Sequence, residues 1–311
     1  MKEQILFSID TPYRQPLPVK GWLFGNESQK SLAIVGALRG NEVQQMFICS
    51  RLIQRLSQME DRIRPDAGIL IVPCANQFSM NVGKRFWAAD NTDINRMFPG
   101  YNEGETTQRI ADRIFRAVQG YSYGIQLATI YLPGLCTPNV RIMHTGYEEP
   151  LEGLDFGLPY VAIRDPQPYD TTTLNYNWQI WNTHAFSLYA SAKEEVSEES
   201  AEQMVNSILH FMACKGMLDA DIQPLCEHPR VFRESSLKNI LNSCGGLMLK
   251  RRKLGEHVCA GDLLAEIMDP MEGSLLEALT APCDGVVFYY HGANLIAGHE
   301  VACRILKDDS V

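Results

Sequence analysis

The chain has 311 residues, of which 45% are hydrophobic, and this is enough to bury one large core and a second, smaller one. The formal net charge of −9 comes from Asp and Glu spread along the sequence, which excludes nucleic acid and anionic membranes as expected partners. The first residues lack the apolar run of a signal peptide, and nine cysteines without a CxxC pair are typical of free thiols, so we expect a cytoplasmic protein.

Apolar runs alternate with amphipathic helices over the first two thirds of the chain, and this alternation predicts an α/β domain. Helices are expected from about Glu42, after Gly104 and from Ser197. The first helix should bury one apolar face, formed by Val43, Met46, Phe47, Ile53 and Leu56. Strands are expected at residues 31–38, 68–74, 124–131, 158–163 and 184–190.

The pattern changes towards the end of the chain, where short β segments punctuated by glycine predict an all-β sandwich. We therefore expect two domains, residues 1–230 with helices on both faces of a mixed sheet and residues 231–311 with the sandwich. The stretches LGEHVCAGDLLAEI and APCDGVV resemble lipoyl and biotinyl domains. The segment DPMEGSLLEALTAP has no lysine to carry a prosthetic group, so we expect the sandwich to shape or shield the site instead.

The richest motif is the stretch VPCANQFSMNVGKRFWAADNTDINRMFPG at residues 72–100, where many polar side chains follow a buried strand. Long loops at strand ends are where α/β proteins place ligand sites. The stretch resembles the substrate loop of the succinylglutamate desuccinylase/aspartoacylase family, and DINRMFPG at residues 93–100 carries the most specific match. Together with the GALRGNE turn at residues 36–42, the resemblance implies a zinc-carboxypeptidase-like fold and a deacylase that cleaves the amide bond of a small N-acyl amino acid.

In that family a zinc ion is held by a His and a Glu of an H-x-x-E turn and by a second His in a D-x-HT strand, while a later Glu activates water. Three protein ligands leave one position open for a water molecule, whose pKa the metal lowers. The resemblance places these four residues at Arg39, Glu42, Ala128 and Tyr189. No histidine precedes His144, so a shifted alignment cannot restore the ligands, and the guanidinium of arginine offers only donors.

Our hypothesis for Arg39 is that it supplies a fixed positive charge in place of the zinc and pairs with Glu42 and with an anion that enters the site. A plain Arg–Glu pair is the alternative. A rebuilt metal site around Glu42 would need further ligands from Asp90, Asp93, Cys74 or His144. His144 is otherwise a loop histidine without a chemical role. The residues themselves predict no cofactor, and zinc is implied by the family alone.

The resemblance assigns Arg85, Asn95 and Arg96 to binding the substrate carboxylate and polarising its acyl carbonyl, work that suits a planar bidentate donor. A solvated loop arginine is the alternative for Arg85 and Arg96. Tyr189 could donate a hydrogen bond as a neutral phenol, but a pKa of about 10 makes it a poor base, and a core tyrosine is the alternative.

The predicted function is that of a deacylase-family protein that acts on or binds a small N-acyl amino acid or related carboxylate. The rival function is a non-catalytic carboxylate-binding or regulatory protein that has lost the metal. Fold similarity alone does not decide between them. The expected partner is a small-molecule carboxylate, and the sequence leaves homo-oligomerisation open.

Overall fold

The computed structural model describes residues 1–10, 15–190 and 196–308 and separates into two compact units. Unit 1 consists of Met1–Thr129 and Pro138–Val231, and unit 2 consists of Ile130–Thr137 and Phe232–Val311. Within the described ranges, no helix is both long and apolar enough to cross a membrane. The nine cysteines are free thiols, and the buried ones are Cys49, Cys74, Cys136 and Cys303.

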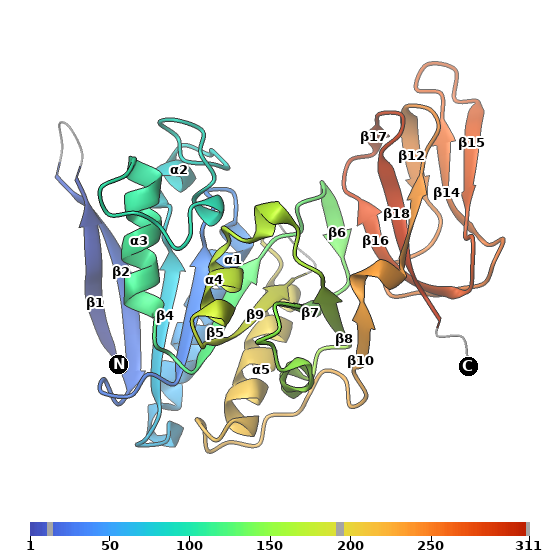
Figure 1. The fold of residues 1–311 in the computed structure, drawn as a ribbon. Helices are drawn as coiled ribbons and strands as arrows, with labels where there is room; N and C mark the ends of the chain where they lie inside the picture. The colour runs from blue at the N-terminus through green and yellow to red at the C-terminus, as the bar shows by residue number, and fades with distance from the viewer. Residues whose placement is uncertain (11–14, 191–195, 309–311) are drawn as a thin grey trace. The chain divides into compact units, whose positions relative to one another are not determined.

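Unit 1 is built on a nine-stranded mixed sheet with the strand order β1-β2-β4-β3-β5-β9-β7-β8-β10 (Figure 1). Its strands are β1 (Lys2–Ile9), β2 (Leu17–Gly25), β3 (Leu32–Ala37), β4 (Gly68–Cys74), β5 (Tyr123–Ala128), β7 (Asn139–Met143), β8 (Tyr160–Arg164), β9 (His184–Tyr189) and β10 (Arg230–Arg233). The central strands β4, β3, β5 and β9 run parallel, and antiparallel pairs follow on both sides. Every residue of β3 is buried, as expected of a parallel strand that helices cover on both faces.

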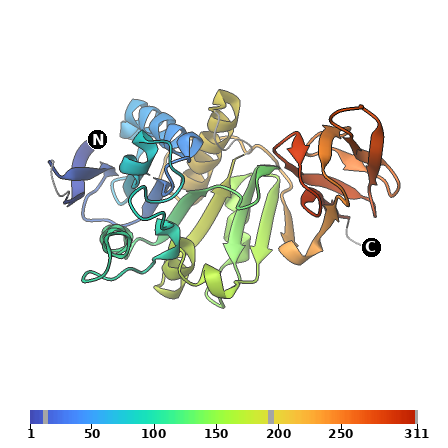
Figure 2. The same cartoon turned by 90° about the horizontal axis from the view of Figure 1, so that it is seen from above.

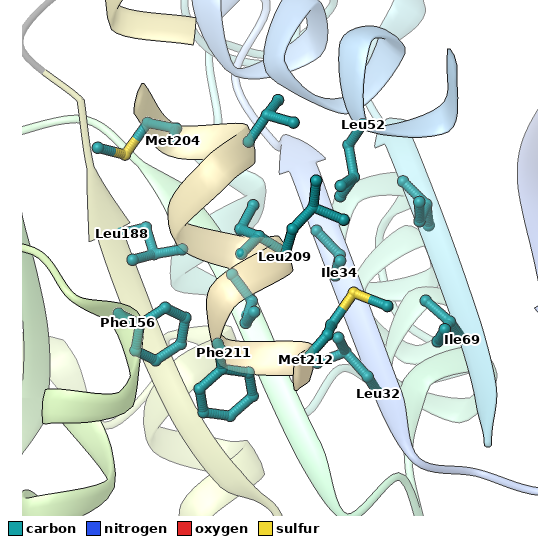
Figure 3. Close-up of a cluster of buried hydrophobic side chains, with 14 of the residues drawn as sticks. Leu32, Ile34, Leu52, Ile69, Phe156, Leu188, Met204, Leu209, Phe211 and Met212 are labelled. Atoms are coloured by element: carbon teal, nitrogen blue, oxygen red, sulfur yellow. The ribbon is translucent and has the colours of Figure 1, made fainter. Parts of the chain in front are cut away.

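Helices cover both faces of this sheet (Figure 2). On one face lie α1 (Val43–Gln58) and α5 (Glu198–Cys214), and on the other lie α3 (Thr106–Val118) and α4 (Leu174–Ile180). Figure 3 shows the core on the first face, where side chains of α5 such as Leu209 and Phe211 meet side chains of the sheet. The shorter helices are α2 (Gln77–Asn81), η1 (Glu60–Arg62), η2 (Ile94–Arg96), η3 (Pro150–Phe156), η4 (Pro168–Asp170) and η5 (Glu234–Ser236).

The mixed α/β architecture predicted from the sequence is confirmed: β3, β4, β5, β8, β9, α1, α3 and α5 lie on the predicted segments. The predicted inner face of α1 is right only in part: Leu56 is buried, Phe47 and Ile53 are half-buried and pack against the core, and Val43 and Met46 are half-buried. The buried apolar stripe consists of Ile48, Cys49, Leu52 and Leu56. Gln44 and Gln45 are buried too, since Gln44 exchanges two hydrogen bonds with the backbone of Ser197 and Gln45 donates to the carbonyl of Ala128. These amide contacts, which apolar periodicity does not reveal, rotate the helix relative to the predicted face.

Unit 2 contains the antiparallel β structure predicted for the end of the chain. One sheet has the order β11-β18-β16-β13, with β6 also paired to β16, and the other has the order β15-β14-β12-β17. The strands are β6 (Gly134–Cys136), β11 (Leu237–Leu241), β12 (Gly246–Lys250), β13 (His257–Val258), β14 (Leu263–Met268), β15 (Leu275–Thr280), β16 (Gly285–His291), β17 (Leu295–Ile296) and β18 (Val301–Lys307). Side chains from both sheets share one apolar core. The resemblance to lipoyl and biotinyl domains stays a prediction.

Candidate functional site

The candidate site lies where the parallel strands of unit 1 end. Residues 38–42 follow β3, residues 75–100 follow β4, Thr129 follows β5, and Tyr189 is the last residue of β9. Because the carboxyl ends of parallel strands meet at one edge of a sheet, segments far apart in the sequence converge there.

Arg39 is buried between two carboxylates. Its Nη1 donates to Glu42 Oε1 at 3.1 Å, and its Nη2 and Nε donate to Asp93 Oδ2 at 2.8 and 3.2 Å. Burial alone lowers the pKa of the guanidinium, but attraction to Glu42 and Asp93 outweighs burial and raises this pKa above its ordinary value. The Arg39–Glu42 pair expected from the sequence is therefore present. The second anion on Arg39 is Asp93 of the same chain, where the sequence hypothesis expected an incoming ligand.

Glu42 has no acceptor capacity left for a metal ion. Its Oε2 accepts from the backbone N–H groups of Leu38 and Arg39, both at 3.0 Å, and its Oε1 accepts from Arg39 Nη1 and from Thr129 Oγ1 at 2.8 Å. A carboxylate offers about four lone-pair positions. All of them are used inside the protein, which satisfies a buried charge that would otherwise be costly.

The residues at the positions that the resemblance assigns to zinc do not fit the ion. Arg39 presents N–H donors, and Ala128, buried at the end of β5, has no side-chain ligand atom. Across residues 1–10, 15–190 and 196–308, no three His, Cys, Asp or Glu side chains form a group that could hold a metal. The other candidate ligands for a metal ion beside Glu42, which are Asp90, Asp93, Cys74 and His144, each have contacts elsewhere.

Asp90 Oδ1 accepts from the backbone N–H of Thr92 in an exposed turn. His144 is exposed and its Nδ1 bonds the carboxylate of Glu148, four residues further on. The Cys74 thiol is buried, and burial, with a smaller contribution from Glu42, raises its pKa to about 11. Asp93 is engaged by Arg39. None of these side chains is joined to Glu42 by an ion pair or hydrogen bond in the described part of the chain.

A close backbone approach holds the Arg85 loop against the turn that carries Arg39. The N–H of Gly40 donates to the carbonyl of Arg85 at 2.9 Å, and a Cβ at Gly40 would lie 2.2 Å from the carbonyl oxygen of Lys84. Only glycine fits at this position of the GALRGNE turn. The side chain of Arg85 is half-buried, with its Cζ 5.3 Å from the ring centre of Phe86. Its predicted role towards a substrate stays a prediction.

The guanidinium of Arg96 makes only weak contacts with other groups in the described part of the chain. Its Nη1 donates a long hydrogen bond of 3.4 Å to the carbonyl of Asn95, and its Cζ lies 5.6 Å from the ring centre of Tyr169. Burial lowers the pKa of Arg96, and Asp93 offsets this only in part because Arg39 acts in the opposite direction. An arginine in this position is still protonated at neutral pH. Arg96 is therefore available to bind an anion, whereas Arg39 is not.

The remaining predicted residues have structural contacts of their own. Asn95 is buried, and its Oδ1 accepts from the N–H of Leu174 at 3.1 Å, which ties the loop to the start of α4. Tyr189 is buried at the end of β9, and the Arg141 guanidinium lies 4.5 Å from its ring centre. A buried tyrosine in this environment fits the core alternative.

Three residues near the site were missed by sequence reasoning: Thr129, Arg141 and Tyr169. Thr129 had a signal, because it follows Ala128 as Thr follows His in the D-x-HT strand of the family. Arg141 and Tyr169 had none, since the strand and the short helix that carry them lie far from the loop motif in sequence. They approach the site because β7 pairs with β9 and because the ring of Tyr169 lies beside Arg96.

Comparisons with known proteins support the resemblance. Residues 28–127 match the model of the succinylglutamate desuccinylase/aspartoacylase catalytic domain. A succinylglutamate desuccinylase/aspartoacylase structure from Rhodobacter sphaeroides is 17% identical, with a TM-score of 0.77 over 94% of this chain and 90% of that chain. An aspartoacylase family protein from Mesorhizobium loti is 18% identical, with a TM-score of 0.76 over 100% of both chains.

The product-bound ectoine utilization protein EutE (DoeB) from Ruegeria pomeroyi is 16% identical, with a TM-score of 0.76 over 94% of this chain and 90% of that chain. At these identities the similarity shows the fold. No curated protein sequence matches the chain. The resemblance inferred from DINRMFPG is thus confirmed, with the catalytic-domain match over residues 28–127 and the family's fold over nearly the whole chain.

Proposed function

On the premise of a succinylglutamate desuccinylase/aspartoacylase catalytic domain over residues 28–127, we propose that this protein binds a small N-acyl amino acid or related carboxylate at Arg96. We further propose that the Arg39–Glu42–Asp93 ion pairs replace the zinc site of the family. The observation that carries the proposal is the contrast between two arginines. Arg39 is engaged by two carboxylates, whereas Arg96 holds one long hydrogen bond to a backbone carbonyl.

Arg96 suits a carboxylate because its planar fork offers two parallel N–H donors. The bond from Leu174 to Asn95 fixes the backbone next to Arg96, so the guanidinium projects from a rigid loop. The Asn95 Nδ2 group remains a proposed second donor to the ligand. A rigid support reduces the entropy lost when a ligand orders the side chain.

Binding without zinc-dependent hydrolysis follows from the donor sets. A zinc-bound water needs three protein ligands, and the assigned positions supply a guanidinium, a saturated carboxylate and a methyl group. The position that the resemblance assigns to the general base holds Tyr189, a buried phenol with the Arg141 guanidinium 4.5 Å from its ring centre, and a phenol is a poor base at neutral pH. The deacylase-type ancestry explains the ligand class, and the ion pairs explain why cleavage is not expected.

Replacing Arg96 tests the anion site. Arg96→Ala should weaken the binding of N-acetyl-L-glutamate by about 1.5–3 kcal/mol, the value of a hydrogen bond to a charged group. Arg96→Lys should restore part of that loss, since an ammonium keeps the charge but not the planar fork. Isothermal titration and a melting temperature on the same samples separate lost binding from lost folding. Arg109→Ala, which removes an exposed arginine of α3, is the matched control. If Arg96→Ala bound the ligand with unaltered affinity, the proposed anion site at Arg96 would be contradicted.

Metal analysis tests the second part of the proposal. Protein purified without chelator should contain well under one equivalent of zinc by mass spectrometry, because one carboxylate cannot hold the ion against water. Arg39→His with Ala128→His should raise zinc affinity, since two imidazoles would then face Glu42. Stoichiometric zinc in the parent protein contradicts the proposal, and an unchanged metal content in the folded double variant contradicts the residue assignments.

A further inference from the structure

Polar side chains form a row across three neighbouring strands on the α4 face of the sheet. Gln126 of β5 is the register partner of Ser187 of β9, and Ser187 is the register partner of Arg141 of β7. Alternate residues of a strand point to opposite faces. The residues that flank the row all lie in the core on the other face: Ile125, Leu127, Val140, Ile142, Phe186 and Leu188. Gln126 and Ser187 are buried.

Asn175 lies above this row. The indole of Trp178 packs on Gly124 so closely that a Cβ there would lie 2.8 Å from the ring. Asn175 precedes Trp178 by three residues and so shares its face of α4, while Gln126 follows Gly124 by two residues and shares its face of β5. The amino end of α4 is the end tied to the substrate loop, through Leu174 and Asn95. Asn175 and Gln126 therefore lie on the same side of the contact between Trp178 and Gly124, the side nearer the substrate loop.

The Asn175 carboxamide is unsatisfied. The residue is 1% exposed, and neither its Oδ1 nor its Nδ2 has a hydrogen-bond partner among the residues that the structure describes. Most buried side-chain polar atoms in proteins are paired, and an unpaired amide lowers the stability of the fold. Asn177, two residues away, shows the usual situation: its Nδ2 donates to the carbonyls of Thr171 and Thr173 at 3.0 and 2.9 Å.

We propose that Asn175, with Gln126 beside it, binds the amide group of an N-acyl ligand whose carboxylate is held by Arg96. This inference rests on the proposed carboxylate site and adds the residues that select among carboxylates. A carboxamide matches a secondary amide at both atoms, because Nδ2 donates to the acyl oxygen and Oδ1 accepts from the amide N–H. Ligands that carry only a carboxylate leave Asn175 unpaired and bind more weakly.

Three ligands of equal chain length separate the contribution of the acyl oxygen from that of the amide N–H. N-acetylglycine presents an acyl oxygen and an N–H, 4-oxopentanoate presents the oxygen alone, and pentanoate presents neither. The parent protein should bind them in that order, with N-acetylglycine about 5- to 30-fold tighter than pentanoate, the range for one or two neutral hydrogen bonds. Isothermal titration gives the three affinities under one set of conditions.

Asn175→Leu replaces the amide by an apolar group with the same number and branching of non-hydrogen atoms. In this variant the preference for N-acetylglycine over pentanoate should fall towards one, while pentanoate affinity stays as in the parent. The melting temperature should be unchanged or higher, since an unpaired polar group is replaced by an apolar one. The matched control Asn177→Leu should show the opposite pattern, a lower melting temperature with the parent's ligand preference. Gln126→Leu should reduce the preference by a smaller factor than Asn175→Leu.

The outcomes distinguish the proposed amide contact of Asn175 from the proposed carboxylate site at Arg96 on which it rests. Equal binding of all three ligands by the parent overturns the amide role and leaves the Arg96 site standing. A parent-like preference in the folded Asn175→Leu variant overturns the assignment to Asn175. Binding of none of the three ligands overturns both proposals. Arg96→Ala should weaken all three ligands by the same factor, because they share the carboxylate.

Discussion

At the scale of single residues, Arg39 organises the charges of the candidate site. It stands where the family resemblance expects a histidine, and it forms ion pairs with both Glu42 and Asp93. The guanidinium supplies one positive charge to two carboxylates, and the backbone N–H groups of Leu38 and Arg39 stabilise the Glu42 carboxylate further. Removing one partner of a buried ion pair destabilises far more than the pair itself contributes.

Arg39→Met should therefore destabilise unit 1 by about 3–5 kcal/mol, because Glu42 and Asp93 become buried charges without a cation. Chemical denaturation at pH 7 measures the loss. Adding Glu42→Gln and Asp93→Asn to the same protein should restore part of the stability. Arg109→Met, at an exposed position, should be neutral, and an Arg39→Met variant as stable as the parent would contradict the proposed ion pairs.

At the scale of elements, the packing of α4 on β5 and β9 sets the geometry of the site. Trp178 lies on Gly124, its Nε1 donates to the carbonyl of Val118, and Leu174 is fixed by Asn95. These contacts fix both ends of a helix of seven residues, which is too short to be stable alone. The same contacts place Asn175 over the sheet, so the position of this helix decides which polar groups meet a ligand.

Gly124→Ala should destabilise the protein by about 1–3 kcal/mol, the range for adding a methyl group to a filled core. The added Cβ would meet the Trp178 ring at 2.8 Å. Thermal unfolding of Gly124→Ala, Trp178→Phe and the double variant measures the coupling between the two positions, and the double variant should be more stable than the sum of the single changes predicts. Gly298→Ala is the control, because its nearest neighbour lies at an ordinary 3.4 Å. Additive effects would show that the ring does not rest on Gly124.

At the scale of the whole molecule, each of the two units is built from two separate segments of the chain. After Thr129 the chain enters unit 2, supplies β6, and returns to unit 1 at Pro138. β6 pairs with the second half of β16, where it occupies an edge that β13 leaves open. A covered edge protects a sheet against pairing with other chains.

Gly134→Val should selectively destabilise unit 2. A Cβ at Gly134 would lie 2.2 Å from the carbonyl oxygen of Tyr290, so the side chain pushes β6 away from β16. Scanning calorimetry should show the unfolding of unit 2 shifted to lower temperature by several degrees, as expected for about 1–3 kcal/mol in a small domain. Leu135→Thr, an exposed change on the same strand, should leave the transition in place. A uniform shift of the whole unfolding curve would contradict the separate contribution of β6.

The sequence by itself determined the α/β architecture and the family resemblance. Both are local signals: fully apolar runs such as GILIVPC identify buried strands, and DINRMFPG is one continuous loop whose residues need no tertiary contact to be recognised. The absence of any histidine before His144 is also visible without coordinates. The predicted face of α1 was right only in part, because Gln44 and Gln45 are buried through hydrogen bonds to backbone groups of distant segments.

Only the tertiary structure decided which charges pair and which polar groups remain unpaired. Asp93 lies 54 residues from Arg39 and meets it because β3 and β4 end side by side. The Asn175 amide has no hydrogen-bond partner among the described residues, which no pattern in the sequence indicates. Periodicity in a sequence records whether a side chain is buried, but its partner depends on the path of the chain. For this protein, the path of the chain after β4 decides that Arg39 meets Asp93, a partner that the sequence did not predict.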